Sequence, residues 1–428
     1  MIEKLQTTFS QFNLKSNSGI DKAFAYLGNY VFTSTTDVLV FMQATKEAAY
    51  ALNYKHGILE GLYYMALLGF LKGDSEIYKS NFKELENNVS NKEGDIAQAW
   101  FFMLQAAISR ENVKVDDTLD LYRITYELAQ MCGLAYLEAR ARFNYATTFD
   151  VASGRTPRLE ALKKIELKNL ENDYPGLASH IYMQTAQSFA GVGMYNQALS
   201  YIEPAIKLAR YDLAPHALAQ CLMEKALILM NTHQYDEAIR FFNETYEVSE
   251  KNDLLAKVPA CVNLTEIYRL IGNRDKAWDM LYHTESLIND SPEFIYPKMV
   301  LESIKGNLLV TDCKYEEARN AVESTIPFLS GNHRLAELAA AYETLGNILK
   351  IEKNFESAIE VFEKLRQLDK EIAEERNAEQ IANIEITNRM QEAETERKRS
   401  LELRLEKERS ETLLLNILPA EVAEELKL

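Results

Sequence analysis

The chain has 428 residues, of which 47% are hydrophobic and 10% aromatic, enough apolar side chains for several domains or one long repeat array. Its formal net charge of −17, without a clustered basic face, disfavours nucleic acid and anionic membrane surfaces as partners. No run approaches the roughly 18 apolar residues of a membrane-spanning helix and the N-terminus lacks a signal-peptide pattern, so we expect a cytoplasmic protein.

Residues 1–170 are expected to form irregular helix pairs. Thr118 fits the register of the later repeats, because Ala106 stands twelve residues before it and Tyr122 four residues after it. The second helix of the first pair is expected to open within residues 37–44. Terminal repeats of an array are commonly atypical, since they cap the stack.

Residues 175–370 carry an alanine about every 40 residues, and the same residue types recur around each one. These anchor alanines are Ala198, Ala238, Ala277, Ala318 and Ala358. The residues twelve positions earlier are small: Ala186, Ala226, Thr265, Gly306 and Gly346. The residues four positions later are large and apolar: Ile202, Phe242, Leu281, Val322 and Phe362. Antiparallel helices approach closely where a small residue faces a larger one, so each repeat is predicted to be a packed helix pair.

This pattern resembles the tetratricopeptide (TPR) repeat, in which a small residue of the first helix is followed by Tyr-x-x-Ala at the start of the second. Tyr195–Ala198 and Tyr235–Ala238 show that signature. The resemblance implies an all-α superhelix of about nine helix pairs over residues 1–370, in which each pair is stabilised by its neighbours. Such long repeats resemble those of bacterial peptide-sensing regulators and of sensor regions fused to signalling enzymes. A peptide or protein ligand is therefore the expected partner.

Prolines are expected to mark helix starts. Four of them precede an expected first helix: Pro175, Pro215, Pro259 and Pro292. Proline is favoured in a first turn, where its missing N–H costs nothing. Pro204 and Pro327 instead fall inside expected second helices, which they should kink or end.

A ligand groove is predicted on the first helices of the regular repeats. In the TPR register, the position eleven before each anchor alanine faces the concave side, and it holds Gln187, Leu227, Glu266, Asn307 and Asn347. Arg269 and Lys350 come eight positions before an anchor. Amides can bind a peptide backbone and cations a carboxylate or phosphate. The candidate groove residues are Gln187, Glu266, Arg269, Asn307, Asn347 and Lys350.

Residues 371–412 contain neither glycine nor proline and keep a rough three-to-four spacing of apolar residues. We expect the last second helix to continue into a parallel coiled coil that makes the protein a homodimer. Thr387, Arg397 and Arg404 interrupt the seam. Two interpretations stay open: a marginal, solvated coiled coil, or one that changes register as a switch.

Residues 413–428 predict a helix, a break at proline and a second short helix. The leucine-rich pattern lies on Leu414, Leu415, Leu418, Pro419, Val422, Ala423 and Leu426. It resembles the linker that precedes the catalytic domain of class III adenylate and guanylate cyclases. That resemblance implies a signalling hinge in front of an output domain beyond residue 428.

Sequence motifs of catalysis are absent from the chain. It has no Walker loop, no Rossmann glycine fingerprint, no HExxH and no nucleophile elbow. The six histidines lack metal-ligand spacing, and the four cysteines are far apart and expected to be buried small hydrophobic residues. We therefore expect no catalytic residue, metal or cofactor in this chain.

Three functions remain open from the sequence. The first is the sensor and dimerising signal helix of a class III cyclase. The second is a non-catalytic TPR receptor or scaffold that binds a peptide or protein. The third is a sensor of another enzyme such as a histidine kinase or phosphatase, although no histidine follows His333 to serve as a phosphoacceptor in the coiled coil.

Overall fold

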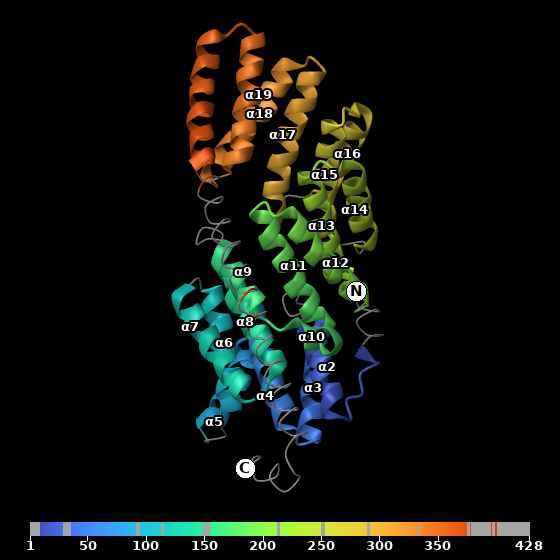
Figure 1. Ribbon diagram of the computed structural model, residues 1–428, viewed down its shortest axis with the longest axis vertical. Coiled ribbons are helices and arrows are strands. Elements are labelled where there is room, and N and C mark those ends of the chain that lie inside the picture. The colour runs from blue at the N-terminus through green and yellow to red at the C-terminus, as the bar shows by residue number, and fades with distance from the viewer. Residues whose placement is uncertain are drawn as a thin grey trace, which may run out of the picture. The chain divides into compact units, whose positions relative to one another are not determined.

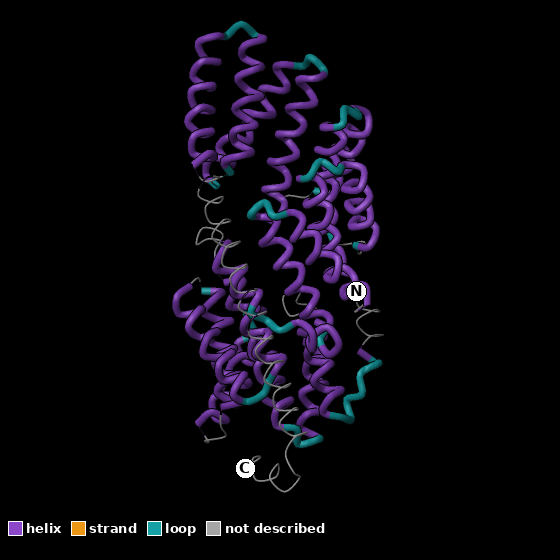
Figure 2. Tube along the Cα trace, viewed as in Figure 1, coloured by secondary structure: helices purple, strands orange, loops and turns teal. Residues whose placement is uncertain are grey.

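The computed structural model describes residues 9–28, 36–90, 95–112, 115–148, 155–211, 215–249, 253–288, 292–332 and 334–374, and single residues at 377, 395 and 399. These described ranges consist of helices and short connections and contain no strand (Figure 2). The predicted all-α class is thereby confirmed. The chain divides into two compact units, Met1–Asp369 and Lys370–Leu428.

The N-terminal half of the first unit is made of α2 to α10 (Figure 1). Their bounds are α2 Asn17–Gly28, α3 Thr36–Ala51, α4 Lys55–Lys72, α5 Ser75–Ser90, α6 Asp95–Glu111, α7 Val115–Met131, α8 Ala135–Thr148, α9 Arg155–Lys163 and α10 Leu167–Asp173. Neighbours in sequence pack on one another, and α8 contacts both α7 and α9.

The regular half follows, from α11 to a helix over residues 355–374. Its elements are α11 Pro175–Gly191, α12 Tyr195–Tyr211, α13 Pro215–Asn231, α14 Tyr235–Val248, α15 Leu254–Leu270, α16 Arg274–Leu287, the 3-10 turn η3 Pro292–Phe294, α17 Ile295–Thr311, α18 Tyr315–Gly331 and α19 Leu335–Ile351. Leaving α10 aside, the described helices from α2 onward group into nine consecutive pairs, as predicted.

Two of the regular pairs show the predicted close contact between a small and a large residue. All five anchor alanines are buried. A Cβ atom added at Gly306 would lie 2.4 Å from Val322 Cγ2, and one at Gly346 would lie 2.8 Å from the Phe362 ring. Real Cβ atoms do not come this close, so these two glycines allow the first and second helices to touch.

The first pairs are joined by a larger and more aromatic core. Thr118, Ala106 and Tyr122 are all buried, so the predicted register extends into α6 and α7. Phe24 and Trp100 are also buried in this core, together with many residues of α4. Because α4 is apolar on nearly every face, it is enclosed by its neighbours rather than lying on one side of a two-layer stack.

Three of the four predicted helix starts at proline are confirmed, and Pro204 and Pro327 lie inside α12 and α18. Pro175 and Pro215 begin α11 and α13, and Pro292 begins η3 directly before α17. The prediction for Pro259 was wrong, because this residue lies inside α15. The helix begins earlier, at Leu254, since the Asp253 side chain accepts a hydrogen bond from the Ala256 amide (3.3 Å) and caps it.

The turn inside each regular repeat has a residue in the left-handed region five positions before the anchor alanine. These residues are Gly193, His233, Gly272, Cys313 and Lys353, with φ between 59° and 76°. Cys313 is therefore exposed in a turn, contrary to the prediction of buried cysteines, while Cys221 and Cys261 are buried as predicted and Cys132 is half-buried.

Candidate functional site

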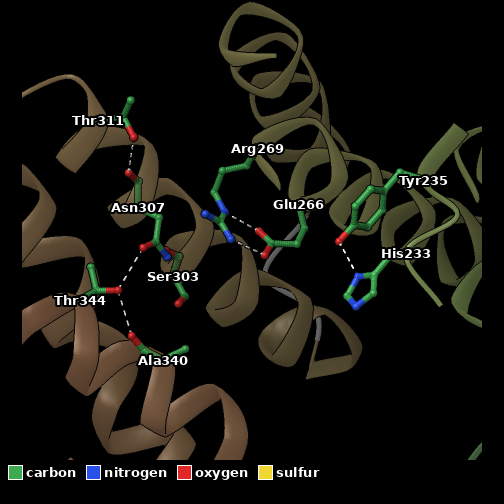
Figure 3. Close-up of polar contacts among 9 residues, drawn as sticks. All are labelled: His233, Tyr235, Glu266, Arg269, Ser303, Asn307, Thr311, Ala340 and Thr344. Carbon is green, nitrogen blue, oxygen red and sulfur yellow. Dashed lines mark hydrogen bonds and ion pairs between the residues drawn. The ribbon is translucent and has the colours of Figure 1, made fainter. Parts of the chain in front are cut away.

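The predicted groove residues all lie on first helices. Gln187 on α11 is exposed, and its Oε1 accepts a hydrogen bond from Arg158 Nη2 of α9 at 3.3 Å. Glu266 and Arg269 on α15 form a bidentate pair in which Arg269 Nη2 and Nε donate to the carboxylate at 2.7 and 2.8 Å (Figure 3). This pair holds one positive and one negative group on adjacent turns of α15.

A hydrogen bond joins the next two first helices. Thr344 Oγ1 of α19 lies 3.0 Å from Asn307 Oδ1 of α17 and 2.9 Å from the Ala340 carbonyl (Figure 3). Asn307 Nδ2 donates to the Ser303 carbonyl at 3.1 Å. The Asn307 amide is thus fixed in orientation by partners on both helices.

Two further predicted residues lie near the end of the array. Asn347 and Lys350, both on α19, are exposed. Leu227 occupies the equivalent position on α13 and is half-buried, so the row of polar residues is interrupted there.

Polar residues that the sequence analysis missed stand three positions before the predicted ones. They are Gln184, Glu224, Asn263 and Thr344, and residues three apart on a helix share a face. Burial raises the pKa of Glu224 to about 7, and the nearby Arg158 cation opposes this rise. On α13 the polar group of this face is therefore Glu224. The helical three-residue spacing could have revealed it, whereas no sequence signal places Arg158 beside it.

The signalling hinge and most of the coiled coil lie outside the described residues. This applies to Leu414, Leu415, Leu418, Pro419, Val422 and Leu426, and to the coiled coil beyond residue 374 apart from three isolated positions. The predicted dimer seam and hinge remain predictions.

A hollow of about 320 Å³ lies where the N-terminal half meets the regular half, lined by residues of α2, α8 and α10 to α12. Its aromatic lining consists of Phe12, Tyr26, Tyr136, Tyr174 and Tyr211. This volume is at the lower end for a small-molecule pocket.

Three possible metal ligands meet near this hollow, although they are distant in sequence. One ligand atom each from Asp21, His56 and Glu60 lies within 4.8 Å of the others. Trp100 Nε1 donates to His56 Nδ1 at 3.4 Å, which places the proton of a neutral ring on Nε2, 3.9 Å from Glu60 Oε2. That proton occupies the nitrogen a metal ion would need.

Burial favours the neutral forms of His56 and Glu60 in this cluster. Burial lowers the pKa of His56 to about 4. Burial, and then the charge of Asp21, raises the pKa of Glu60 well above its usual value. Tyr54 donates to both carboxylate oxygens of Asp21, at 2.9 and 3.1 Å. In the absence of a bound ion, the cluster therefore holds a protonated Glu60 beside a neutral imidazole.

Comparisons with known proteins identify the fold. Residues 339–371, which include most of α19 and most of the following helix, match the tetratricopeptide repeat family. No curated protein matches the chain. Its structure is similar to that of RapI without ligand, at 11% identity and a TM-score of 0.60, covering 83% of this chain and 98% of RapI.

Two further solved structures have the same architecture. The apo quorum sensor NprR from B. thuringiensis is 15% identical with a TM-score of 0.57, covering 81% of this chain and 97% of NprR. A Rap protein complexed with competence and sporulation factor is 14% identical with a TM-score of 0.54, covering 87% of this chain and 99% of that protein. The chain has a TPR-like all-helical repeat fold.

None of the described helices combines the length and the apolar character needed to cross a bilayer.

Proposed function

We propose that this chain is a regulatory receptor whose first-helix face, defined as the exposed side of α11, α13, α15, α17 and α19, binds a peptide or a segment of a protein. The observation that carries the proposal is the succession of amide and paired charged groups on this face, from Gln187 through Glu266–Arg269 to Asn307 and Asn347.

The geometry of the array suits an extended chain. Successive first helices contact one another. Packed helix axes lie about 8–10 Å apart and an extended peptide rises about 3.3 Å per residue, so each helix would meet about every third residue. Asparagine and glutamine side chains offer a donor and an acceptor, as a peptide group does. These groups would bind the ligand backbone, and the Glu266–Arg269 pair would select charged side chains or a terminus.

The structural neighbours support a regulatory role. One is named as a quorum sensor and another was solved in complex with competence and sporulation factor. Their likeness to this chain is one of fold, so the ligand proposed here rests on the first-helix face itself.

A selection from random peptides tests the proposal. The full chain is used to enrich peptides of about ten residues from a display library, and the affinity of a selected peptide is measured by fluorescence anisotropy. Replacing Asn307 and Asn347 by alanine together should weaken binding about tenfold or more, since each lost hydrogen bond contributes about 1 kcal/mol.

The matched control removes amides from the opposite side of the repeats. Asn243 on α14 and Asn320 on α18 are both exposed. Their replacement by alanine should leave affinity within about twofold, well below a tenfold effect. Failure to enrich any peptide, or equal losses in the two double variants, would contradict the proposal.

A second candidate is that this receptor regulates a class III nucleotidyl cyclase. It rests on the sequence pattern from Leu414 to Leu426 alone. In that case residues 371–412 would hold two chains as a cytoplasmic homodimer, and Pro419 would separate the signal helix from the catalytic domain.

Two measurements test this candidate. A reading frame that continues past codon 428 into an α/β domain with two metal-ligand aspartates would support it, and a stop codon would contradict it. Sedimentation of residues 1–428 should show a dimer that is weakened by truncation after residue 370, whereas a monomeric chain would contradict the coiled coil.

A further inference from the structure

The Arg140 guanidinium on α8 lacks a counter-ion among the residues that the structure describes. Its Nη2 donates to the Gly28 carbonyl, at the end of α2, at 3.2 Å. Its Nη1 is shielded from solvent and has no hydrogen-bond partner within the described part of the chain. The ionisable groups that act on it most strongly are the uncharged phenols of Tyr63, Tyr64, Tyr122 and Tyr136, and His180, which also interacts with it, is a base and no counter-ion.

A small cavity of about 20 Å³ adjoins this guanidinium. Tyr63, Tyr64 and Tyr122 line it and are at most 4% exposed, so it lies within the N-terminal core. A cavity must offer roughly 10–15 Å³ to hold one water molecule. This cavity therefore has room for one group of about that size.

The lining of the cavity is rich in hydrogen-bond donors and positive charge. Arg110, Arg140 and Asn144 contribute side chains to it, and the Tyr122 hydroxyl interacts with both Arg110 and Asn144. Among the described residues, Glu111 is the one acidic member of the lining, and it is exposed. A water molecule would satisfy the Nη1 hydrogen but would leave the guanidinium charge uncompensated in a region of low dielectric constant.

We propose that this cavity binds one small monovalent anion, a halide ion or a carboxylate group, held chiefly by Arg140 with Asn144 and Tyr122. The anion would lie where α2, α4, α6, α7 and α8 meet. The anion would thereby connect five helices, which come from the first four helix pairs, through a single charge. This inference does not depend on the proposed peptide site.

Anion-dependent stability of the full chain tests the proposal. Thermal unfolding is compared in sodium chloride, bromide, formate and gluconate at constant ionic strength, gluconate being too large for the cavity. With about 100 mM halide and a dissociation constant near 10 mM, the Tm should rise by roughly 1.5–2 °C over gluconate and should keep rising with the logarithm of the halide concentration. Line broadening of the 35Cl resonance gives an independent measure of binding.

Three variants locate the effect. Arg140→Met should abolish the anion dependence. Arg142→Met is the matched control, because Arg142 lies two residues along α8, pairs with Glu138 at 2.9 Å and stacks on Tyr126. It should lower the Tm in every salt and keep the anion dependence.

Asn144→Asp keeps the test decisive if Arg140→Met does not fold. Asn144 is one helical turn from Arg140 on the same face, so an aspartate there would supply a carboxylate of nearly the same shape. It should raise the Tm in gluconate and remove the response to added anions.

The outcomes separate the two sources of the anion. A response to halides alone assigns the site to a halide ion. A response to formate that equals or exceeds it assigns the site to a carboxylate group. Equal Tm values in all four salts, or a salt response that Asn144→Asp leaves unchanged, would overturn the proposal and leave the cavity to water.

Discussion

Gly306 on α17 lies so close to α18 that a Cβ atom at this position would be 2.4 Å from Val322 Cγ2. The two residues are sixteen positions apart and belong to the recurring small and large positions of the repeat.

Gly306→Ala should therefore destabilise the array although alanine favours helix. Overpacking a core costs about 1–3 kcal/mol, and the gain in helix propensity is about 1 kcal/mol. Val322→Ala should recover stability in the Gly306→Ala background, while it should destabilise the parent chain by leaving a cavity. Urea unfolding of the four chains measures this coupling, and strictly additive effects would show that the contact does not limit the packing.

Cys313→Gly should stabilise the protein. Cys313 has φ 60° at a turn position where two other repeats have glycine. A residue with a Cβ atom is disfavoured by about 1 kcal/mol in the left-handed region. Cys313→Ala, which keeps the Cβ atom, is the control and should leave the urea midpoint nearly unchanged. If Cys313→Gly lowered the urea midpoint, the Cys313 side chain would make a contact that stabilises the fold by more than the relief of backbone strain.

Glu60→Gln should stabilise the protein relative to the parent chain, increasingly as the pH rises above about 4.5, the ordinary pKa of a glutamate. The pKa of Glu60 is raised in the folded state, so this group favours folding below its unfolded pKa and loses that contribution as the pH rises towards the folded pKa. The glutamine side chain of the variant would stay neutral at every pH and would escape the loss.

The pKa of His56 is lowered rather than raised, so this residue changes the stability of the protein over a different pH range. Its pKa falls to about 4, so its contribution is lost as the pH falls from about 6.5 towards 4. Because both chains contain His56, its contribution cancels from the difference between them. Urea midpoints of parent and Glu60→Gln should diverge from about pH 5 upwards, and Glu323→Gln, an exposed control on α18, should follow the parent. Parallel curves would contradict a protonated Glu60.

The repeat array could be predicted because its signal is local and periodic. The spacing of Ala198 and its equivalents specifies helix pairs without reference to distant contacts. The helix start predicted at Pro259 was wrong because the Asp253 cap, and not the proline, determines where α15 begins. The left-handed turn position is easily recognised at Gly193 and Gly272, but the same conformation at Cys313 has no such signal.

The polar sites were less accessible to sequence reasoning, because their contacts join different repeats. The helix register placed Glu266 and Asn307 on one face, but the bond from Thr344 to Asn307 spans 37 residues. Arg140 and Gly28 are 112 residues apart, and Asp21 is far from His56 in sequence. Such juxtapositions follow from how the helix pairs pack on one another, which the repeat pattern alone does not specify.

The account depends most on where a ligand binds, and hydrogen–deuterium exchange with a selected peptide tests this most directly. Peptide binding should slow exchange in α15, α17 and α19, around Glu266, Asn307 and Asn347, and should leave α14, α16 and α18 unchanged. Replacing Asn307 and Asn347 by alanine should remove the protection at the same peptide concentration. Protection confined to the second helices, or to the aromatic hollow at Tyr136 and Tyr174, would contradict the proposed site.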